Sequence, residues 1–262
     1  MEVRDLLSNI VKDASQREQV QIILDKAARA GKNHKLMITD FLEPGIIGIA
    51  IPFLKNLTEI KYQIAGGYHQ AERARLIFMP AWDQQDETSA NISFIIVEGN
   101  NQLAKLSHRD FLGALIGLGI KREKIGDLLL VESGCQVILD SDFVDYIRFN
   151  LTKVGSLKVN VRELIKDQLV VPSDNSKAET KTVASLRLDV ILAAGFNISR
   201  DKAAAYIQGE KVKLNHIYNN NNACQVKEGD LISCRGKGRL QLIEVSGETK
   251  KGRIKIIFNK YA

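Results

Sequence analysis

Apolar residues recur at helical spacing through the first thirty residues of the chain. Intervals of three and four predict two amphipathic helices within residues 3–30, closed at Gly31, because glycine readily takes the left-handed conformation that ends many helices. Apolar segments at 46–53 and 57–64 follow, then Gly66-Gly67-Tyr68 and a polar run over 69–75. The pattern predicts a mixed α/β unit over residues 1–85 that ends in a helix or turn.

A clearer pattern begins near residue 91. Strands are expected at 92–97, 128–131, 137–139 and 157–161, with helices opening at Ser107 and Ser141. Ser107 with Asp110 three residues on is typical of a capped helix start. The order strand, helix, strand, strand, helix, strand is the split βαβ arrangement of ferredoxin-like and RRM-type domains, so we expect an RRM-like middle domain over residues 86–171.

The sheet of this middle domain lacks the aromatic residues with which RRM domains stack bases, since its strands offer Phe94 and mainly aliphatic side chains. A scaffold role is favoured over a stacking role, and both interpretations are open. Residues 172–181 are polar, include Pro172 and show no apolar periodicity, which predicts a linker.

The last segment, residues 182–262, predicts a further domain and makes the chain α+β overall. Residues 183–194 form an expected helix stopped by Gly195, and Ser199 caps a second helix that runs to Gly209. An alternating segment at 211–215 and a strand at 231–234 follow.

The excess of basic over acidic residues is confined to this last segment. Residues 181–262 hold 15 lysines and arginines against 7 acidic residues, whereas the other 180 residues hold 22 against 24. A basic segment on a near-neutral body favours a polyanionic partner, because each phosphate contact releases condensed counterions. A merely well-solvated surface is the alternative.

The start of the second helix is a candidate phosphate site, since its first N–H groups have no partner within the helix. Arg200 and Lys202 add positive charge there, and Arg187 on the preceding helix can reach the same face. An ion pair of Arg187 with Asp189 or Asp201 is the structural alternative.

Cations alternate with glycines in Arg235-Gly236-Lys237-Gly238-Arg239. Glycine lets a backbone approach a phosphate while arginine and lysine supply charge, although a flexible basic hairpin would have the same composition. A second basic group has two equally supported interpretations, another RNA surface or a solvated edge. The group consists of Arg109, Lys121, Arg122 and Lys124.

The last third resembles the S4 domain, a fold shared with a small-subunit ribosomal protein, some pseudouridine synthases and tyrosyl-tRNA synthetases. The resemblance covers residues 183–240 and rests on Leu186-Arg187-Leu188-Asp189, Gly195, Ser199-Arg200, Ile207, Gly209, Val212, Asn215 and Gly229-Asp230. S4 domains bind structured RNA. The resemblance therefore implies an RNA face formed or flanked by Arg187, Ser199, Arg200, Lys202, Lys211, Lys213 and Asn215.

Nearly the whole chain resembles YlmH-type S4-domain proteins, whose cyanobacterial and plastid relatives are called photosystem II S4 domain proteins. This resemblance rests on residues 106–115 and 119–127 and on Gly66-Gly67-Tyr68 with Ala71-Glu72-Arg73. It implies ribosome association, with binding to rRNA and tRNA on a large subunit that carries stalled peptidyl-tRNA in ribosome-associated quality control.

We expect a non-catalytic, monomeric, cytoplasmic protein without cofactor or metal. The charged start of the chain is unlike a signal peptide, no apolar run is long enough to span a membrane, and the three cysteines lack metal-binding spacing. Two rivals remain. One is an RNA-modifying enzyme that uses His69, Glu72 and Arg73, and the other is a photosystem or other protein-assembly factor.

Overall fold

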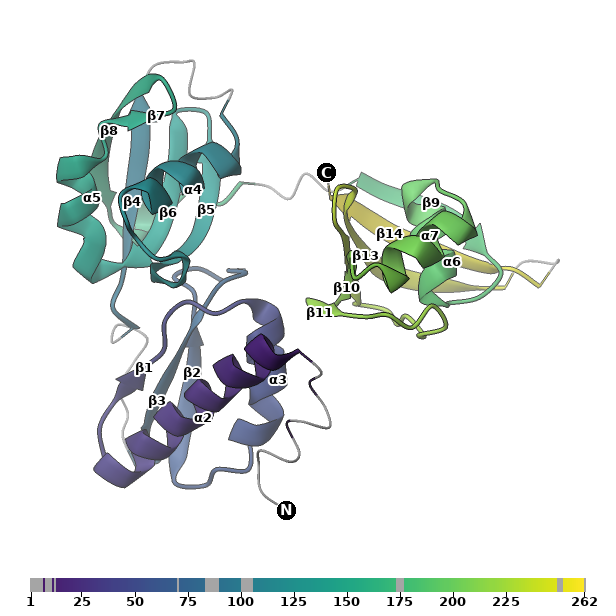
Figure 1. The fold of residues 1–262 in the computed structure, drawn as a ribbon, viewed down its shortest axis with the longest axis horizontal. Helices are drawn as coiled ribbons and strands as arrows, with labels where there is room; N and C mark the ends of the chain where they lie inside the picture. The colour runs from purple at the N-terminus through teal and green to yellow at the C-terminus, as the bar shows by residue number, and fades with distance from the viewer. Residues whose placement is uncertain are drawn as a thin grey trace. The chain divides into compact units, whose positions relative to one another are not determined.

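The computed structural model describes residues 7, 11, 13–69, 71–82, 90–99, 106–172, 177–248 and 252–261. The chain divides into two compact units, residues 1–172 and 173–262 (Figure 1). The first unit contains two sheets with their helices, and the second contains one sheet with two helices. The fold is therefore mixed, with helices packed on several antiparallel sheets.

The first part of unit one packs two helices against a small sheet. Helix α2 (Ala14–Asn33) lies against α3 (Pro44–Leu54), and the sheet has the order β1 (Met37–Ile38), β3 (Arg75–Pro80), β2 (Ile60–Ala65). Asp13 opens α2 by accepting a hydrogen bond from the Gln16 N–H at 3.0 Å, and His34 closes it in the left-handed conformation.

Two sequence expectations for this part are changed, and a third is not tested. The first predicted helix lies largely outside the described residues. Gly31 does not end α2 but lies buried inside it, where a β-carbon would approach Ile60 Cγ2 at 3.2 Å. The described part of the polar run after Gly66 contains bends and a turn, one of the two predicted possibilities, but the unit does not end there: the run leads into β3, a fully buried strand that pairs with β2.

The middle part has the predicted order of elements: β4 (Ile92–Gly99), α4 (His108–Gly117), β5 (Ile125–Val131), β6 (Gly134–Asp140), α5 (Val144–Asn150) and β8 (Leu157–Leu164). A short β7 (Lys153–Val154) pairs with β8, and the antiparallel sheet has the order β5-β6-β4-β8-β7. Ser107 and Asp110 form the predicted capping box at α4. Before α5, residues Ser141–Phe143 form a 3-10 turn that Asp140, rather than Ser141, caps.

Helices α4 and α5 cover one face of this sheet, and apolar side chains from the rest of unit one cover much of the other. Phe94, Ile138 and Leu164 on the sheet cluster with Phe41 and with the half-buried Tyr68. Gly126 and Gly67 permit this close approach, because a β-carbon at either would lie 2.8 Å from an aromatic carbon. The aliphatic character of the strands thus follows from their being a packing surface.

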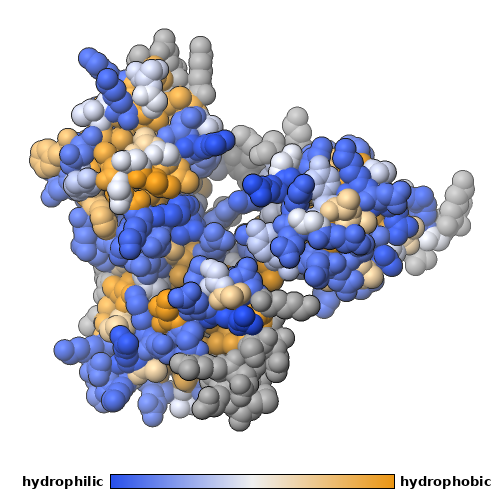
Figure 2. Space-filling view, in the orientation of Figure 1, coloured by the Kyte–Doolittle hydropathy of each residue, from blue (hydrophilic) through white to orange (hydrophobic). Residues whose placement is uncertain are grey.

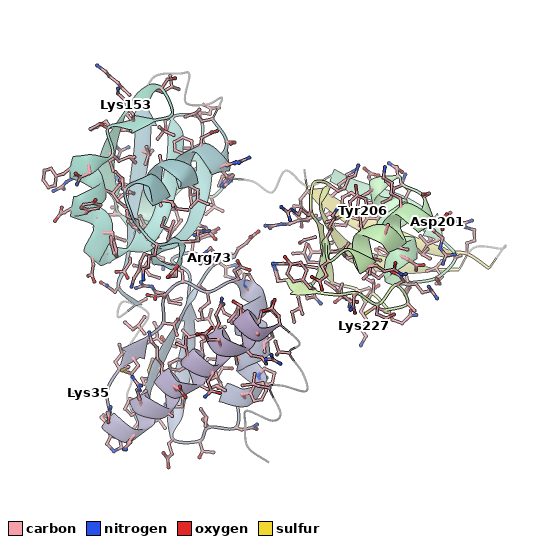
Figure 3. The ribbon with its side chains drawn as sticks, in the orientation of Figure 1. Lys35, Arg73, Lys153, Asp201, Tyr206 and Lys227 are labelled. Carbon is pink, nitrogen blue, oxygen red and sulfur yellow. The ribbon has the colours of Figure 1, made fainter. Side chains whose placement is uncertain are left out.

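A buried carboxylate holds the two parts of unit one together. Asp127 accepts hydrogen bonds from the Tyr68 hydroxyl at 2.8 Å and from the N–H groups of Glu72 and Arg73 at 2.7 and 3.0 Å. The Arg73 guanidinium donates to the carbonyls of Phe41 and Ile125. Figure 3 shows Arg73 at the junction between the two parts of unit one. Burial, followed by the Asp127 charge, raises the pKa of Tyr68, so this hydroxyl stays protonated as a donor.

A second ionic network lies at the same junction. Arg75 is buried, pairs with Asp140 and stacks over Phe41 at 4.8 Å. Lys124 bridges Asp40 at 2.6 Å and Asp140 at 3.3 Å. Because charges are costly to bury unless paired, these contacts fix the two sheets in one arrangement.

Unit two is a six-stranded antiparallel sheet with two helices on one face. The strand order is β11 (Ile217–Tyr218), β10 (Val212–Leu214), β12 (Leu231–Cys234), β13 (Gly238–Glu248), β14 (Ile254–Tyr261), β9 (Lys177–Val183). Helices α6 (Leu188–Phe196) and α7 (Arg200–Gln208) share a core with the sheet residues Val212, Ile232, Leu240 and Phe258.

Two expectations for unit two are wrong. Residues 177–181, predicted as linker, belong to strand β9, which pairs with β14 from Lys177 to Val183. An edge strand held by backbone hydrogen bonds needs no apolar alternation, and here Val183 supplies its buried side chain. The predicted helix over 183–194, stopped by Gly195, is instead α6, which begins at Leu188 and continues through Gly195. Glycine suits this position because a β-carbon there would lie 2.2 Å from the Leu240 side chain.

We predict that Asp127→Ala destabilises unit one by about 3 kcal/mol, because it leaves three donors at the junction without their acceptor. Urea unfolding followed by circular dichroism measures the loss. Asp145→Ala is the control, since its pair with Arg148 is a surface contact worth less than about 0.5 kcal/mol. Equal effects of the two variants would contradict a structural role for Asp127.

Candidate nucleic-acid interface

The α6–α7 connection presents the first turn of α7 at the surface. Asn197 takes the left-handed conformation with φ +52° and ends α6, and Ser199 then caps α7 by accepting from the Lys202 N–H at 3.3 Å. The chain reverses within three residues because αL geometry and a capping hydroxyl follow each other directly. The structure thus has the capped helix start on which the predicted phosphate site depends, with Ser199 and Arg200 exposed.

One buried carboxylate organises the cations around this turn. Asp189 has 6% of its side chain exposed and accepts two hydrogen bonds from Arg187, at 3.0 and 3.1 Å, and one from Arg200, at 2.8 Å. Burial alone would raise the pKa of Asp189, but the hydrogen bonds from the two guanidinium groups outweigh it and hold the pKa below its usual value.

This arrangement carries a net positive charge despite the ion pairs. The single carboxylate is shared by two guanidinium groups, and the Arg200 side chain remains 61% exposed. Lys202, two residues further along α7, is also exposed. The ion pair considered for Arg187 is therefore present, and it positions Arg187 and Arg200 beside the α7 start. Such a constellation can bind a phosphate through both charge and directed N–H donors.

A second group of cations lies at the β12–β13 hairpin. The Arg235 N–H donates to the Lys211 carbonyl at 2.8 Å, and the Lys237 N–H donates to the Cys234 carbonyl at 2.9 Å, which brings the three cationic residues to one end of the sheet. Gly236 takes φ +77° in this turn. The three residues are exposed, whereas Arg239 lies half-buried on β13.

Asn215 and Lys213 occupy different settings from those expected. Asn215 has φ +50°, accepts from the Leu231 N–H at 2.9 Å and donates to Asp230 at 2.8 Å, so its amide shapes the turn after β10. Lys213 lies over the Tyr218 ring at 4.8 Å. Tyr218 was not among the predicted site residues. The sequence feature that could have indicated it is an aromatic residue three positions after the alternating basic segment 211–215.

The structure divides the second predicted basic group. Arg109 and Lys121 are exposed, but Lys124 serves the junction network and Arg122 donates to the carbonyls of Ile125 and Gly126. Burial, followed by the charge of Arg73, lowers the pKa of Arg122 to about 10. Half of this group thus contributes to packing within unit one.

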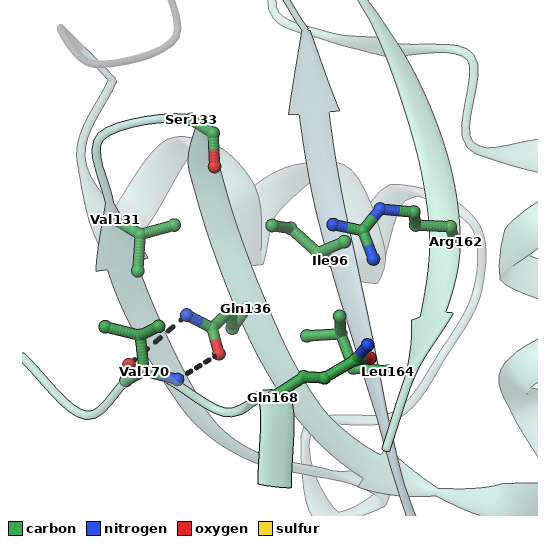
Figure 4. Close-up of a pocket in the computed structure, with 8 residues that line it drawn as sticks. All are labelled: Ile96, Val131, Ser133, Gln136, Arg162, Leu164, Gln168 and Val170. Atoms are coloured by element: carbon green, nitrogen blue, oxygen red, sulfur yellow. Dashed lines mark hydrogen bonds between the residues drawn. The ribbon is translucent and has the colours of Figure 1, made fainter. Parts of the chain in front are cut away.

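A pocket of about 300 Å³ remains on the part of the middle sheet that the aromatic junction does not cover (Figure 4). The amide of Gln136 accepts from the Val170 N–H at 2.9 Å and donates to the Val170 carbonyl at 3.2 Å. Ile96, Arg162 and Leu164 line the same pocket. These two hydrogen bonds hold the segment around Val170, which follows β8, against β6.

Comparison with known proteins places these features in a family. One family model, described as "YlmH, N-terminal", matches residues 15–81, and another, described as "Putative RNA-binding domain in YlmH", matches residues 86–168. A Bacillus subtilis protein called "Ribosome-associated protein quality control protein P2" is 30% identical over 229 residues, covering 87% of this chain and 89% of that protein. The chain belongs to the YlmH family.

A solved structure agrees with this assignment at the level of fold. The "Cell division protein ylmH from Streptococcus pneumoniae" superposes with a TM-score of 0.53 at 21% identity, covering 60% of this chain and 96% of that one. Among the described residues of this YlmH family member, no helix is long and apolar enough to cross a membrane.

We predict that the Asp189 carboxyl titrates below the 3.8 of an unperturbed aspartate. Because its folded-state pKa is depressed, its stabilising contribution is present above about pH 4 and is lost as the pH falls through the folded-state value. The carbon-13 shift of the Asp189 carboxyl, followed by NMR from about pH 6 to about pH 2, measures this directly. A midpoint at or above 3.8 would contradict the pairing with Arg187 and Arg200.

Proposed function

We propose that this protein is a non-catalytic, ribosome-associated RNA-binding protein whose unit two holds structured RNA at the start of α7. The observation that carries the proposal is the arrangement in which buried Asp189 positions Arg187 and Arg200 beside a capped helix N-terminus. Within this proposal, unit two is an S4 domain and the middle part of unit one is RRM-like.

The mechanism is affinity and orientation. Arg200 and Lys202 neutralise phosphates, and the N–H groups of the first turn of α7 fix the register of the backbone that is bound. Figure 2 shows hydrophilic residues over most of the visible face of unit two. Such a surface recognises the shape and phosphates of a folded RNA rather than its base sequence.

The ribosomal setting rests on the relative from Bacillus subtilis, which is named for ribosome-associated protein quality control. We propose that this chain likewise acts on the large ribosomal subunit carrying stalled peptidyl-tRNA, contacting rRNA and tRNA as a monomer in the cytoplasm. The family model for residues 86–168, described as an RNA-binding domain, supports a contribution from unit one.

A non-catalytic role is supported by the setting of the cluster around His69. Tyr68, the Glu72 N–H and Arg73 are held by Asp127 and by carbonyls, so this segment serves the junction between the two sheets of unit one. Turnover of ribosomal RNA by the purified protein would contradict this part of the proposal.

We predict that replacing Arg200 and Lys202 together by alanine weakens binding to ribosomal RNA. The plot of log affinity against log salt should flatten by about 0.7 to 0.9 for each phosphate that the variant no longer neutralises. Fluorescence anisotropy over a salt series measures both effects.

The charge-matched control is Lys32→Ala with Lys35→Ala, two exposed lysines at the end of α2 and just beyond it. An unchanged slope in the Arg200/Lys202 variant, or an equal change in the control, would place the RNA site elsewhere.

A further inference from the structure

The sheet of unit two has a face that its helices do not cover, and a row of side chains crosses it. The strand pairings place Tyr218 opposite Lys213, Lys213 opposite Ser233, Ser233 opposite Arg239 and Arg239 opposite Tyr261. Five neighbouring strands, β11, β10, β12, β13 and β14, thus contribute one residue each. We call these five residues the outer row.

Alternation places the outer row away from the core. Val212, Ile232 and Leu240 are its neighbours along the strands and lie buried under α6 and α7. Because successive side chains on a strand point to opposite faces, the outer row lies on the other side of the sheet. The row therefore lies on a different face from the helices that carry the Asp189 arrangement.

The row has an aromatic residue at each end, a cationic residue next to each of them and Ser233 in the middle, an order that suits a nucleic acid. Lys213 Nζ lies 4.8 Å from the centre of the Tyr218 ring, and 49% of the Tyr218 residue is exposed. Arg239 neighbours Tyr261, whose hydroxyl donates to Gln241 at 2.8 Å. No carboxylate belongs to the row, and each of its rings has a cation beside it on the adjacent strand.

We propose that the outer row binds unpaired RNA nucleotides, with bases stacking on Tyr218 and Tyr261 and phosphates contacting Lys213 and Arg239. The proposal rests on the proposed RNA-binding function and adds a class of ligand to it. Aromatic rings interleaved with cations on an open sheet face are the usual means by which proteins hold single strands.

Spacing constrains how the nucleotides lie. Tyr218 and Tyr261 are separated by four strand intervals of roughly 4.8 Å, which gives about 19 Å. The two rings therefore hold different bases of one strand, with the strand running across the sheet. A duplex keeps its bases stacked on each other and offers none to the rings, so the row discriminates in favour of unpaired RNA.

The test uses the full-length protein and two RNAs that share one hairpin, one blunt and one with a six-nucleotide single-stranded extension containing 2-aminopurine. We expect the extension to tighten binding about tenfold and its fluorescence to be quenched on binding. Tyr218→Leu and Tyr261→Leu should each remove most of that gain, whereas Tyr218→Phe and Tyr261→Phe keep the ring and the gain.

The salt dependence separates this site from that at α7. With the blunt hairpin, leucine at either position should leave the slope with salt unchanged, because that RNA has no extension to reach the outer row, while the Arg200/Lys202 variant should lose slope with both RNAs. Equal affinity for the two RNAs, or leucine variants that bind the extension like wild type, would overturn the outer-row site but leave the proposed function intact. Failure of the wild-type protein to bind either RNA would overturn both.

Discussion

Helices cover only one face of the middle sheet and of the sheet in unit two. What occupies the other face of each sheet decides much of the structure. In the middle sheet, Phe41 and Tyr68 pack onto it beside Phe94 and Ile138. In unit two, the corresponding face carries polar, cationic and aromatic side chains. The uncovered face of a sheet must either be buried by other side chains or carry side chains that suit water. The middle sheet has the first solution and serves as scaffold, and the sheet of unit two has the second and is a candidate binding surface.

Paired charge performs two tasks in the chain. Asp140 and Asp127 lie buried at the junction of unit one, where their hydrogen-bonding and ionic partners join its two sheets. Asp189 is as deeply buried, but its two partners are arginines that remain at the surface. One carboxylate facing two guanidinium groups leaves a positive charge and holds it in a fixed geometry. Preorganised cations lose less side-chain freedom when a phosphate arrives, so this pairing favours binding as well as folding.

The two candidate binding surfaces on unit two differ in what they recognise. The start of α7 offers directed N–H groups and charge, which suit the phosphates of a folded RNA. The outer row offers rings and flanking cations on the opposite face of the sheet, which suit unpaired bases. Ribosomal RNA contains both kinds of element side by side. A small domain with one such surface on each face would select the places where a helix passes into a single strand.

Periodicity and local chemistry in the sequence predicted the split βαβ order of the middle part and the Ser107 and Ser199 caps, because each depends on residues close together in the chain. The resemblance to the YlmH family rests on short segments within residues 66–73 and 106–127, and the family models and the relative from Bacillus subtilis confirmed it. Interactions between distant segments decided the rest. The sequence predicts a helix end at Gly195, whereas α6 continues through it, because the side chain of Leu240 from a distant strand leaves no room for a β-carbon there. The sequence predicts a linker over residues 172–181, but residues 177–181 belong to β9, because pairing with β14 rather than an apolar pattern makes this segment a strand. The outer row joins residues 213, 218, 233, 239 and 261, which become neighbours only through the strand register that tertiary structure sets.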